Sequence, residues 1–194
     1  MKRVIRSGAH FILAMRVLAM AGTSKRFISM HANTLKSFAR IIFGSVWLID
    51  AYFKFQPGFA QNFSSLIQGA AAGQPAWLIP WFSFWVSTTA PNPVLWSYII
   101  AFSELGIALS LIFGFMRRVG YSGGMVLSLL IWAVPEGFGG SYGPSSTDIG
   151  TGVIYAIVFL MLITINALEG PSRYSLDYYI EKKFRWWRKF AEFS

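Results

Sequence analysis

Residues 94–118 read VLWSYIIAFSELGIALSLIFGFMRR, and this stretch decides the fold. Between Val94 and Phe115 the one charged residue is Glu104, and the basic pair Arg117 and Arg118 follows. A helix needs roughly 20 apolar residues, at about 1.5 Å each, to cross a bilayer. The stretch therefore predicts a membrane-spanning helix that ends at a pair of basic residues.

Three further apolar stretches accompany this one. They run from about Phe38 to Phe55, from about Val119 to Pro135 and from about Ile149 to Leu168. The composition agrees, because 55% of the 194 residues are hydrophobic and only 13% are charged, about half the usual charged share. The mean hydropathy is +0.50. We therefore expect one all-α domain, an integral membrane four-helix bundle, rather than a soluble enzyme.

The basic residues predict the orientation of the bundle. All of the 17 Lys and Arg residues except Lys54 precede or begin the first span, separate the second from the third, or follow the fourth. With four spans these groups fall on one side, whereas five spans would separate them. The positive-inside rule then predicts a multi-pass protein of the cell membrane with both termini in the cytoplasm. The net charge of +9 reflects this topology, so no nucleic-acid partner is expected.

The flanking segments divide the chain into three parts. Residues 1–37 form a basic N-terminal extension, either an amphipathic surface helix or the result of an upstream start with Met30 as an alternative initiator. Residues 38–169 form the membrane domain. Residues 170–194 mix basic and aromatic side chains, which predicts an amphipathic helix on the anionic cytoplasmic leaflet.

The long connection between the first two predicted spans contains three tryptophans. Trp77, Trp81 and Trp85 recur at spacings of four residues and so share one face of a helix. The segment is too short to span, so we expect a short interfacial or re-entrant helix. Its indoles form an aromatic belt or line an entrance for a lipid or a quinone.

Each predicted span carries one acidic residue within it or at its outer end, namely Asp50, Glu104, Glu136 and Asp148. A charge in the bilayer costs about 2.5–3.5 kcal/mol, so these side chains are expected to face the interior of the bundle. Lys54 stands four residues after Asp50, which predicts an ion pair. We expect all five to converge in one pocket, with the buried Glu104 protonated. They would cross-link helices, take part in proton chemistry, or hold a hard cation such as Mg²⁺.

Several kinds of site are excluded by the residues that the chain lacks. Without cysteine it holds no iron–sulfur cluster and no thiolate metal site, and both histidines, His10 and His31, precede the first span. We therefore expect no haem and no copper or iron centre, and we assign no metal ligands. The stripe Gly120, Gly124 and Ser128 predicts a close helix–helix contact.

The segment WAVPEGFGGSYGPSSTDIGTG, residues 132–152, is rich in glycine and flanked by acids, and it lacks the GK[ST] of a phosphate loop. Together with GSVWLIDAYFKFQPGF (44–59) and GPSRYSLDYYIEKKF (170–184), it resembles the DoxX/DoxD family of small four-helix membrane proteins. The resemblance covers roughly residues 38–186. The DoxD branch is the membrane subunit of thiosulfate:quinone oxidoreductase, and other members are accessory subunits of membrane redox complexes. The resemblance therefore implies a quinone as cofactor.

We accordingly expect a membrane subunit of a quinone-linked oxidoreductase, similar to thiosulfate:quinone oxidoreductase, with no redox centre of its own. Its partners would be the lipid bilayer and a second subunit or a larger membrane complex. The predicted outer face offers four acids and one lysine, which repel thiosulfate, so an anion site would come largely from the partner. Two alternatives remain: a non-catalytic structural or assembly subunit, and a small proton-coupled transporter.

The residues expected to carry the quinone chemistry fall into two groups. The catalytic group is Glu104, Asp50 and Lys54. The expected lining of the quinone pocket is Trp47, Tyr52, Trp132, Glu136, Asp148, Gly137, Gly139 and Gly140.

Overall fold

The computed structural model describes residues 33–140, 142, 146 and 148–193. All regular elements among these residues are helical, so the predicted all-α class is confirmed. Most of the predicted N-terminal extension, residues 1–32 with both histidines and Met30, lies outside the described residues.

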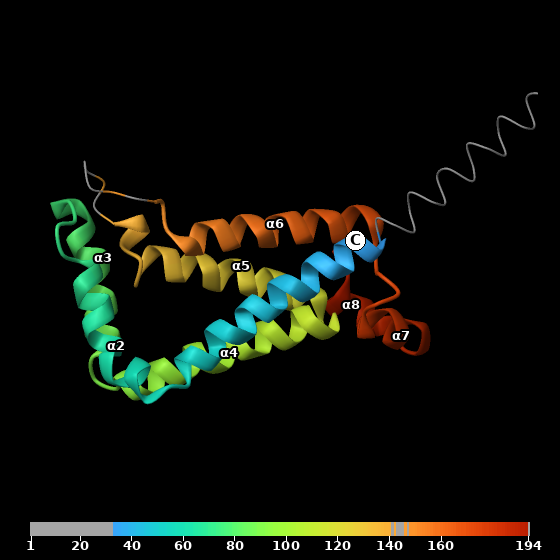
Figure 1. Ribbon diagram of the computed structural model, residues 1–194, viewed down its shortest axis with the longest axis horizontal. Coiled ribbons are helices and arrows are strands. Elements are labelled where there is room, and N and C mark those ends of the chain that lie inside the picture. Colours follow the sequence, from blue (N-terminus) through green and yellow to red (C-terminus); the bar gives the residue numbers. More distant parts are fainter. Residues whose placement is uncertain (1–32, 141, 143–145, 147, 194) are drawn as a thin grey trace, which may run out of the picture.

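Four long helices run between the two ends of an elongated molecule (Figure 1). The first helix covers residues 33–54, and the others are α4 (Pro93–Phe113), α5 (Arg117–Ala133) and α6 (Thr151–Glu169). The four apolar stretches read from the sequence therefore each form a helix, with ends within a few residues of those predicted except at the start of the first helix.

The helix ends follow from local sequence. Asn92 caps α4, since its side chain accepts a hydrogen bond from the amide of Leu95, and Pro93 occupies the first turn, where no amide partner is needed. Gly114 ends α4 in the left-handed conformation at φ 62°. A side chain there would also collide with the guanidinium of Arg40, which crosses from the first helix.

Close contacts between the long helices build the core. The first helix places Phe43 and Trp47 edge-on against Phe159 of α6, with ring centroids 5.0 and 5.5 Å apart. A methyl group added to Gly124 of α5 would lie 2.1 Å from the Phe159 ring, so this glycine lets α5 and α6 approach. The predicted close contact at Gly124 is therefore confirmed.

The connection between the first helix and α4 contains more helix than expected. Helix α2 (Pro57–Ala70) precedes a short turn of 3₁₀ helix, η1 (Ala76–Leu78), and α3 (Ile79–Thr89); α2 and α3 close one end of the molecule (Figure 1). Because α3 begins at Ile79, Trp77 lies before it and is exposed, whereas Trp81 and Trp85 pack inward. The expectation that all three indoles share one helical face is therefore wrong.

The C-terminal segment folds back against the opposite end of the molecule. It contains α7 (Leu176–Lys183), η3 (Arg185–Trp187) and α8 (Arg188–Ala191), so the single amphipathic helix expected there is broken into short pieces. Helix α8 packs on α5, and the ring of Trp187 lies 5.2 Å from that of Phe115, just after α4.

Within the part of the chain that the structure describes, two helices, α4 and α6, are long and apolar enough to cross a membrane. Helix α5 has 17 residues and begins with two arginines, and the first helix carries Lys36, Arg40, Asp50 and Lys54. In the 18-residue windows of α4 and α6 only 33% and 28% of the residues are buried within the chain.

Candidate functional site

A cavity of about 450 Å³ lies where α2, α3, α4 and α5 meet the end of the first helix. Its walls are mainly apolar and aromatic, with rings contributed by Phe59, Phe63, Trp85 and Trp96. Charged side chains reach it from three separate elements, and these are Lys54, Glu104 and Glu136. The structure thus brings together three of the five side chains that the sequence predicts to converge.

An ion pair lies in the cavity wall. Lys54 Nζ is 3.4 Å from Glu104 Oε1, and the lysine also lies over the Phe59 ring, 5.2 Å from its centroid. Glu104 is only 1% exposed, so its burial without Lys54 would be costly. The predicted Asp50–Lys54 pair is wrong, because Lys54 reaches across to α4 and the carboxylate of Asp50 interacts with the Tyr155 hydroxyl instead.

Two buried polar atoms of the cavity wall have no hydrogen-bond partner among the described residues. One is Glu104 Oε2 and the other is the indole nitrogen of Trp85. Buried polar atoms are nearly always satisfied, by protein, by water or by a ligand. One acceptor and one donor on residues of this mainly apolar wall are therefore left without a partner among the described residues, although neither atom is itself exposed.

The wall is held in place by an indole that is fully satisfied. Trp81 Nε1 donates a 2.9 Å hydrogen bond to the carbonyl oxygen of Ala133, near the end of α5. The Trp81 and Trp85 rings lie edge to face at 5.7 Å. Trp81 thus ties α3 to α5 and positions Trp85.

Glu136 has a structural task at the edge of the cavity. Its carboxylate accepts hydrogen bonds from the amide of Gly152, at 2.9 and 3.2 Å, in the first turn of α6. A methyl group on Gly150 would approach Glu136 Oε2 to 2.6 Å. A carboxylate at a helix N-terminus is stabilised by the free amides and the helix dipole. Glu136 therefore caps α6 from a distance.

The glycine-rich segment packs beside the cavity. The side-chain amide of Gln74 donates a 2.8 Å hydrogen bond to the carbonyl oxygen of Gly137, whose φ is 55°. Gly139, at φ 88°, lies so close to Ile149 that a methyl group would approach the Ile149 carbonyl oxygen to 2.4 Å. Gly140 also has positive φ, and a methyl group there would meet nothing. All three fix the turn η2 (Gly137–Gly139) and its exit, but none lines the cavity.

The other predicted pocket residues lie elsewhere. Trp47 is buried in the core against Phe43 and Phe159, and Tyr52 is exposed on the outer side of the first helix. Trp132 donates its indole N–H to the Ile149 carbonyl oxygen at 2.7 Å. Asp148 is exposed and accepts a hydrogen bond from the Gly150 amide at 2.8 Å. Trp47, Trp132 and Asp148 therefore stabilise the bundle or the loop, and none of the four lines the cavity.

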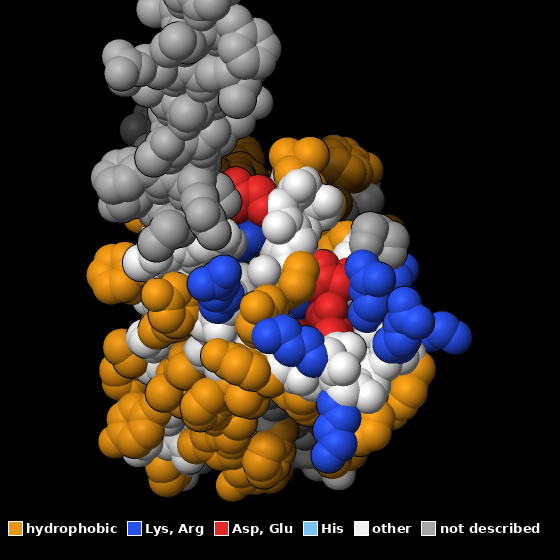
Figure 2. All heavy atoms as spheres, turned by 90° about the vertical axis from the view of Figure 1, so that its right-hand side faces the viewer, with side chains coloured by type: hydrophobic (Ala, Val, Ile, Leu, Met, Phe, Trp, Pro, Cys, Tyr) orange, Lys and Arg blue, Asp and Glu red, His pale blue; other side chains and the backbone are white. Residues whose placement is uncertain are grey.

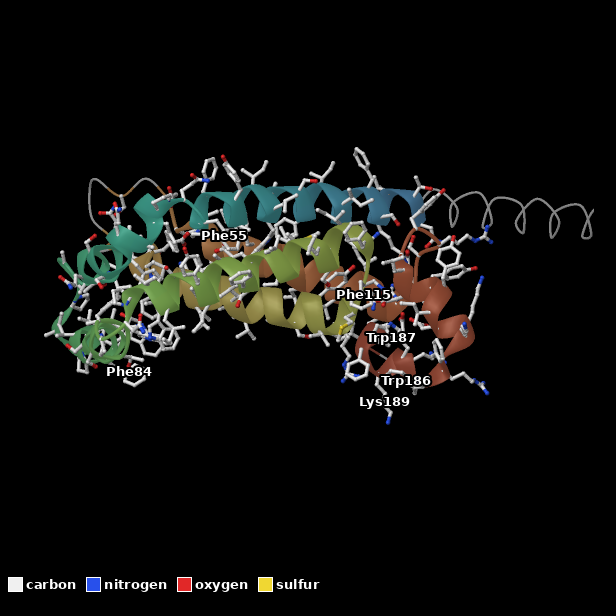
Figure 3. The ribbon with its side chains drawn as sticks, turned by 90° about the horizontal axis from the view of Figure 1, so that it is seen from below. Phe55, Phe84, Phe115, Trp186, Trp187 and Lys189 are labelled. Carbon is white, nitrogen blue, oxygen red and sulfur yellow. The ribbon has the colours of Figure 1, made fainter. Side chains whose placement is uncertain are left out.

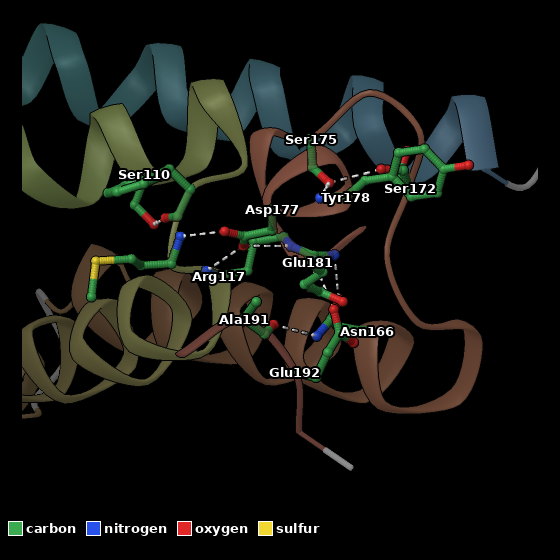
Figure 4. Close-up of polar contacts among 12 residues, drawn as sticks. Ser110, Arg117, Asn166, Ser172, Ser175, Asp177, Tyr178, Glu181, Ala191 and Glu192 are labelled. Atoms are coloured by element: carbon green, nitrogen blue, oxygen red, sulfur yellow. Dashed lines mark hydrogen bonds and ion pairs between the residues drawn. The ribbon is translucent and has the colours of Figure 1, made fainter. Parts of the chain in front are cut away.

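A second polar cluster lies at the opposite end of the molecule (Figure 4). Arg117, at the start of α5, is buried and pairs with Asp177, Glu181 and Glu192. Its Nη1 also donates to Asn166 Oδ1 on α6, at 2.9 Å. The sequence places these acids in the tail but gives no sign that they converge on one arginine.

No family model, curated protein or solved structure matches the chain. The resemblance to the DoxX/DoxD family therefore stays a prediction.

Proposed function

We propose that the chain is an integral membrane protein in which the first helix, α4, α5 and α6 all cross the bilayer. The core helix of a soluble protein would be mostly buried, whereas only 33% of the apolar window of α4 and 28% of that of α6 are buried within the chain. Neither lies near the N-terminus, where a signal sequence would stand. At 21 residues, α4 is about 31 Å long, close to the hydrocarbon thickness of roughly 30 Å.

Within that bilayer we infer that the cavity binds a quinone, and that the protein is the membrane subunit of a quinone-linked oxidoreductase. The observation that carries this proposal is the Lys54–Glu104 ion pair in the wall of a largely apolar, aromatic cavity, where Glu104 Oε2 and Trp85 Nε1 also lack a partner among the described residues. A quinone needs an apolar slot, donors for its carbonyl oxygens and a protonatable group within reach.

Three side chains of the cavity wall would have separate roles in binding a quinone and handling its proton. The indole of Trp85 and the ammonium of Lys54 are two potential donors to a carbonyl oxygen. Glu104 lies beside Lys54 and offers the carboxyl group that holds or passes a proton. A bound quinone supplies two-electron redox chemistry, and the electrons would come from a partner subunit.

The test measures quenching of tryptophan fluorescence by a short-chain ubiquinone, with the full chain in lipid nanodiscs. Trp85→Phe should abolish a large share of the saturable quenching, whereas the matched control Trp77→Phe, at an exposed position, should leave the binding constant unchanged. Glu104→Gln should weaken binding at least several-fold, whereas Glu169→Gln, on the far end of α6, should not. Equal, unsaturable quenching in all variants would contradict the proposal.

A second function, that of a structural or assembly subunit, is favoured by a separate observation. An open apolar groove of about 1030 Å³ follows α4 and α5, with small residues such as Gly106 and Gly123 at its floor. Small residues let transmembrane helices approach closely. A partner helix would bury this groove.

The chain itself provides the means to test that docking. A methyl group on Gly106 would meet nothing within 4 Å, so Gly106→Leu fills the groove without disturbing the chain. Co-purification of partner subunits from native membrane should be lost with Gly106→Leu and kept with Gly69→Leu, an equally open glycine on α2. Full co-purification with Gly106→Leu would remove the groove as a partner site.

A further inference from the structure

The C-terminal tail, residues 170–193, sorts its charges by sign. Its three acids point inward, since Asp177 and Glu192 are buried and the side chain of Glu181 is 11% exposed. Its basic residues all lie on the outside: Arg173, Lys182, Lys183, Arg185, Arg188 and Lys189. The outer surface of the tail is therefore strongly positive, although the segment also contains acids.

Arg117 holds this arrangement in place. Its Nε donates to Asp177 Oδ2 at 2.9 Å and its Nη2 reaches Glu181 and Glu192. Asp177 also accepts the backbone amides of Met116 and Arg117, at 2.9 and 3.0 Å, and so caps α5. Because each acid is engaged with a buried arginine, none is available to neutralise the outer bases except through the distant contact of 3.9 Å between Arg188 and Glu181.

Aromatic side chains stand among the exposed bases. Trp187 packs inward on Phe115 and donates to Asp177 Oδ1 at 2.8 Å, whereas Trp186 and Lys189 point away from the bundle (Figure 3). Phe184 and Trp186 are about half exposed. Figure 2, which looks onto this end, shows the Lys and Arg side chains spread around the tail beside apolar side chains.

We propose that this outer surface of the tail binds the headgroups of anionic phospholipids in the leaflet at this end of the bundle. The tail packs against α5 at its first residues and follows α6 directly, so in the proposed membrane placement it lies at headgroup level. Basic residues there are attracted to an anionic leaflet, and indole rings favour the same depth. An acidic protein surface would need the bases but gives no reason for the exposed aromatic rings.

The inference rests on the proposed membrane placement, which carbonate extraction tests independently. Release of the wild-type chain from membranes by carbonate would overturn the placement itself. Retention of the chain, together with failure of the lipid test below, would overturn the lipid inference alone.

The lipid test uses the full chain extracted from membranes that contain phosphatidylcholine and phosphatidylglycerol. The lipids that co-purify are identified by mass spectrometry. We expect several-fold enrichment of phosphatidylglycerol, and loss of that enrichment in the variant Lys182→Gln, Lys183→Gln, Arg185→Gln and Lys189→Gln. These four side chains are exposed and make no ion pair with a described residue, so the variant should fold.

The matched control keeps the charge and changes the side chains: Lys182→Arg, Lys183→Arg, Arg185→Lys and Lys189→Arg. It should retain the enrichment, which should also weaken as salt rises from about 0.1 M to about 1 M because exposed charges are screened. Unchanged enrichment in the neutral variant would overturn the inference. Absence of phosphatidylglycerol enrichment in the wild type would also overturn the inference. An acidic protein partner would then be the remaining occupant of this surface.

Discussion

At the scale of single residues, Gly124 and its neighbour Gly123 make a matched pair on α5. A methyl group on Gly124 would collide with the Phe159 ring, whereas one on Gly123 would meet nothing within 4 Å. Overpacking a core costs about 1–3 kcal/mol, and replacing an open helical glycine with alanine gains about 1 kcal/mol. Gly124→Ala should therefore lower the thermal unfolding midpoint in detergent, and Gly123→Ala should hold or raise it. A larger loss for Gly123→Ala would contradict the packing described.

Residue-level prediction from the sequence succeeds where burial alone decides. Glu104 is predicted to be buried because a charge in an apolar helix must avoid lipid, and it is. The partner of Lys54 is predicted wrongly, because helical spacing identifies Asp50 as a neighbour on the same helix but says nothing of α4 passing alongside. Trp85 belongs to the predicted aromatic entrance, but its unpaired indole becomes visible only once the packing of α3 is known.

At the scale of elements, we expect the docking of α7 to depend on pH through Glu181. Burial, and then the neighbouring carboxylate of Glu192, raises the pKa of Glu181 to about 7. Arg117 opposes this shift and Asp177 adds to it, while Arg188 stands 3.9 Å away. The docked tail therefore binds a proton more readily than the free tail does.

The sign of the effect follows from that difference. Between the usual value of 4.5 and about 7, the docked state holds the proton and the undocked state has lost it, so docking weakens as pH rises through this window. Hydrogen exchange of the α7 amides, corrected for intrinsic rates, should be faster at pH 8 than at pH 5. Glu181→Gln should remove most of this dependence. Exchange that slows with rising pH would reverse the assignment.

Helix α2 is indicated by its sequence, whereas the break in the C-terminal tail is not. Phe59, Phe63 and Ile67 recur every four residues after Pro57, which is typical of an amphipathic helix beginning at a proline. The sequence alone therefore indicates this helix. The break of the tail into α7, η3 and α8 has no comparable signal, because it follows from contacts with Arg117 and Phe115, far away in sequence.

At the scale of the whole molecule, the arrangement of the ends gives a test of the proposed topology. Helix α3 and the tail lie at opposite ends of the bundle (Figure 1). The chain contains no cysteine, so Ser87→Cys in α3 and Lys183→Cys in α7 provide single exposed labels. In oriented vesicles an impermeant thiol reagent should reach one and not the other. Labelling of both from the same side would contradict the four-span topology.

The pairing of Arg117 with three acids of the tail has a consequence for biogenesis. The ribosome makes Arg117 some 60 residues before Asp177, so during the proposed membrane insertion this arginine would be an uncompensated cation beside Arg118. In the proposed topology it would act in that interval as a charge that keeps the α4–α5 turn from being translocated. Once synthesis reaches Glu192, the same guanidinium is neutralised and enclosed. In the proposed topology one residue would first orient the nascent chain and afterwards hold the folded tail against α5.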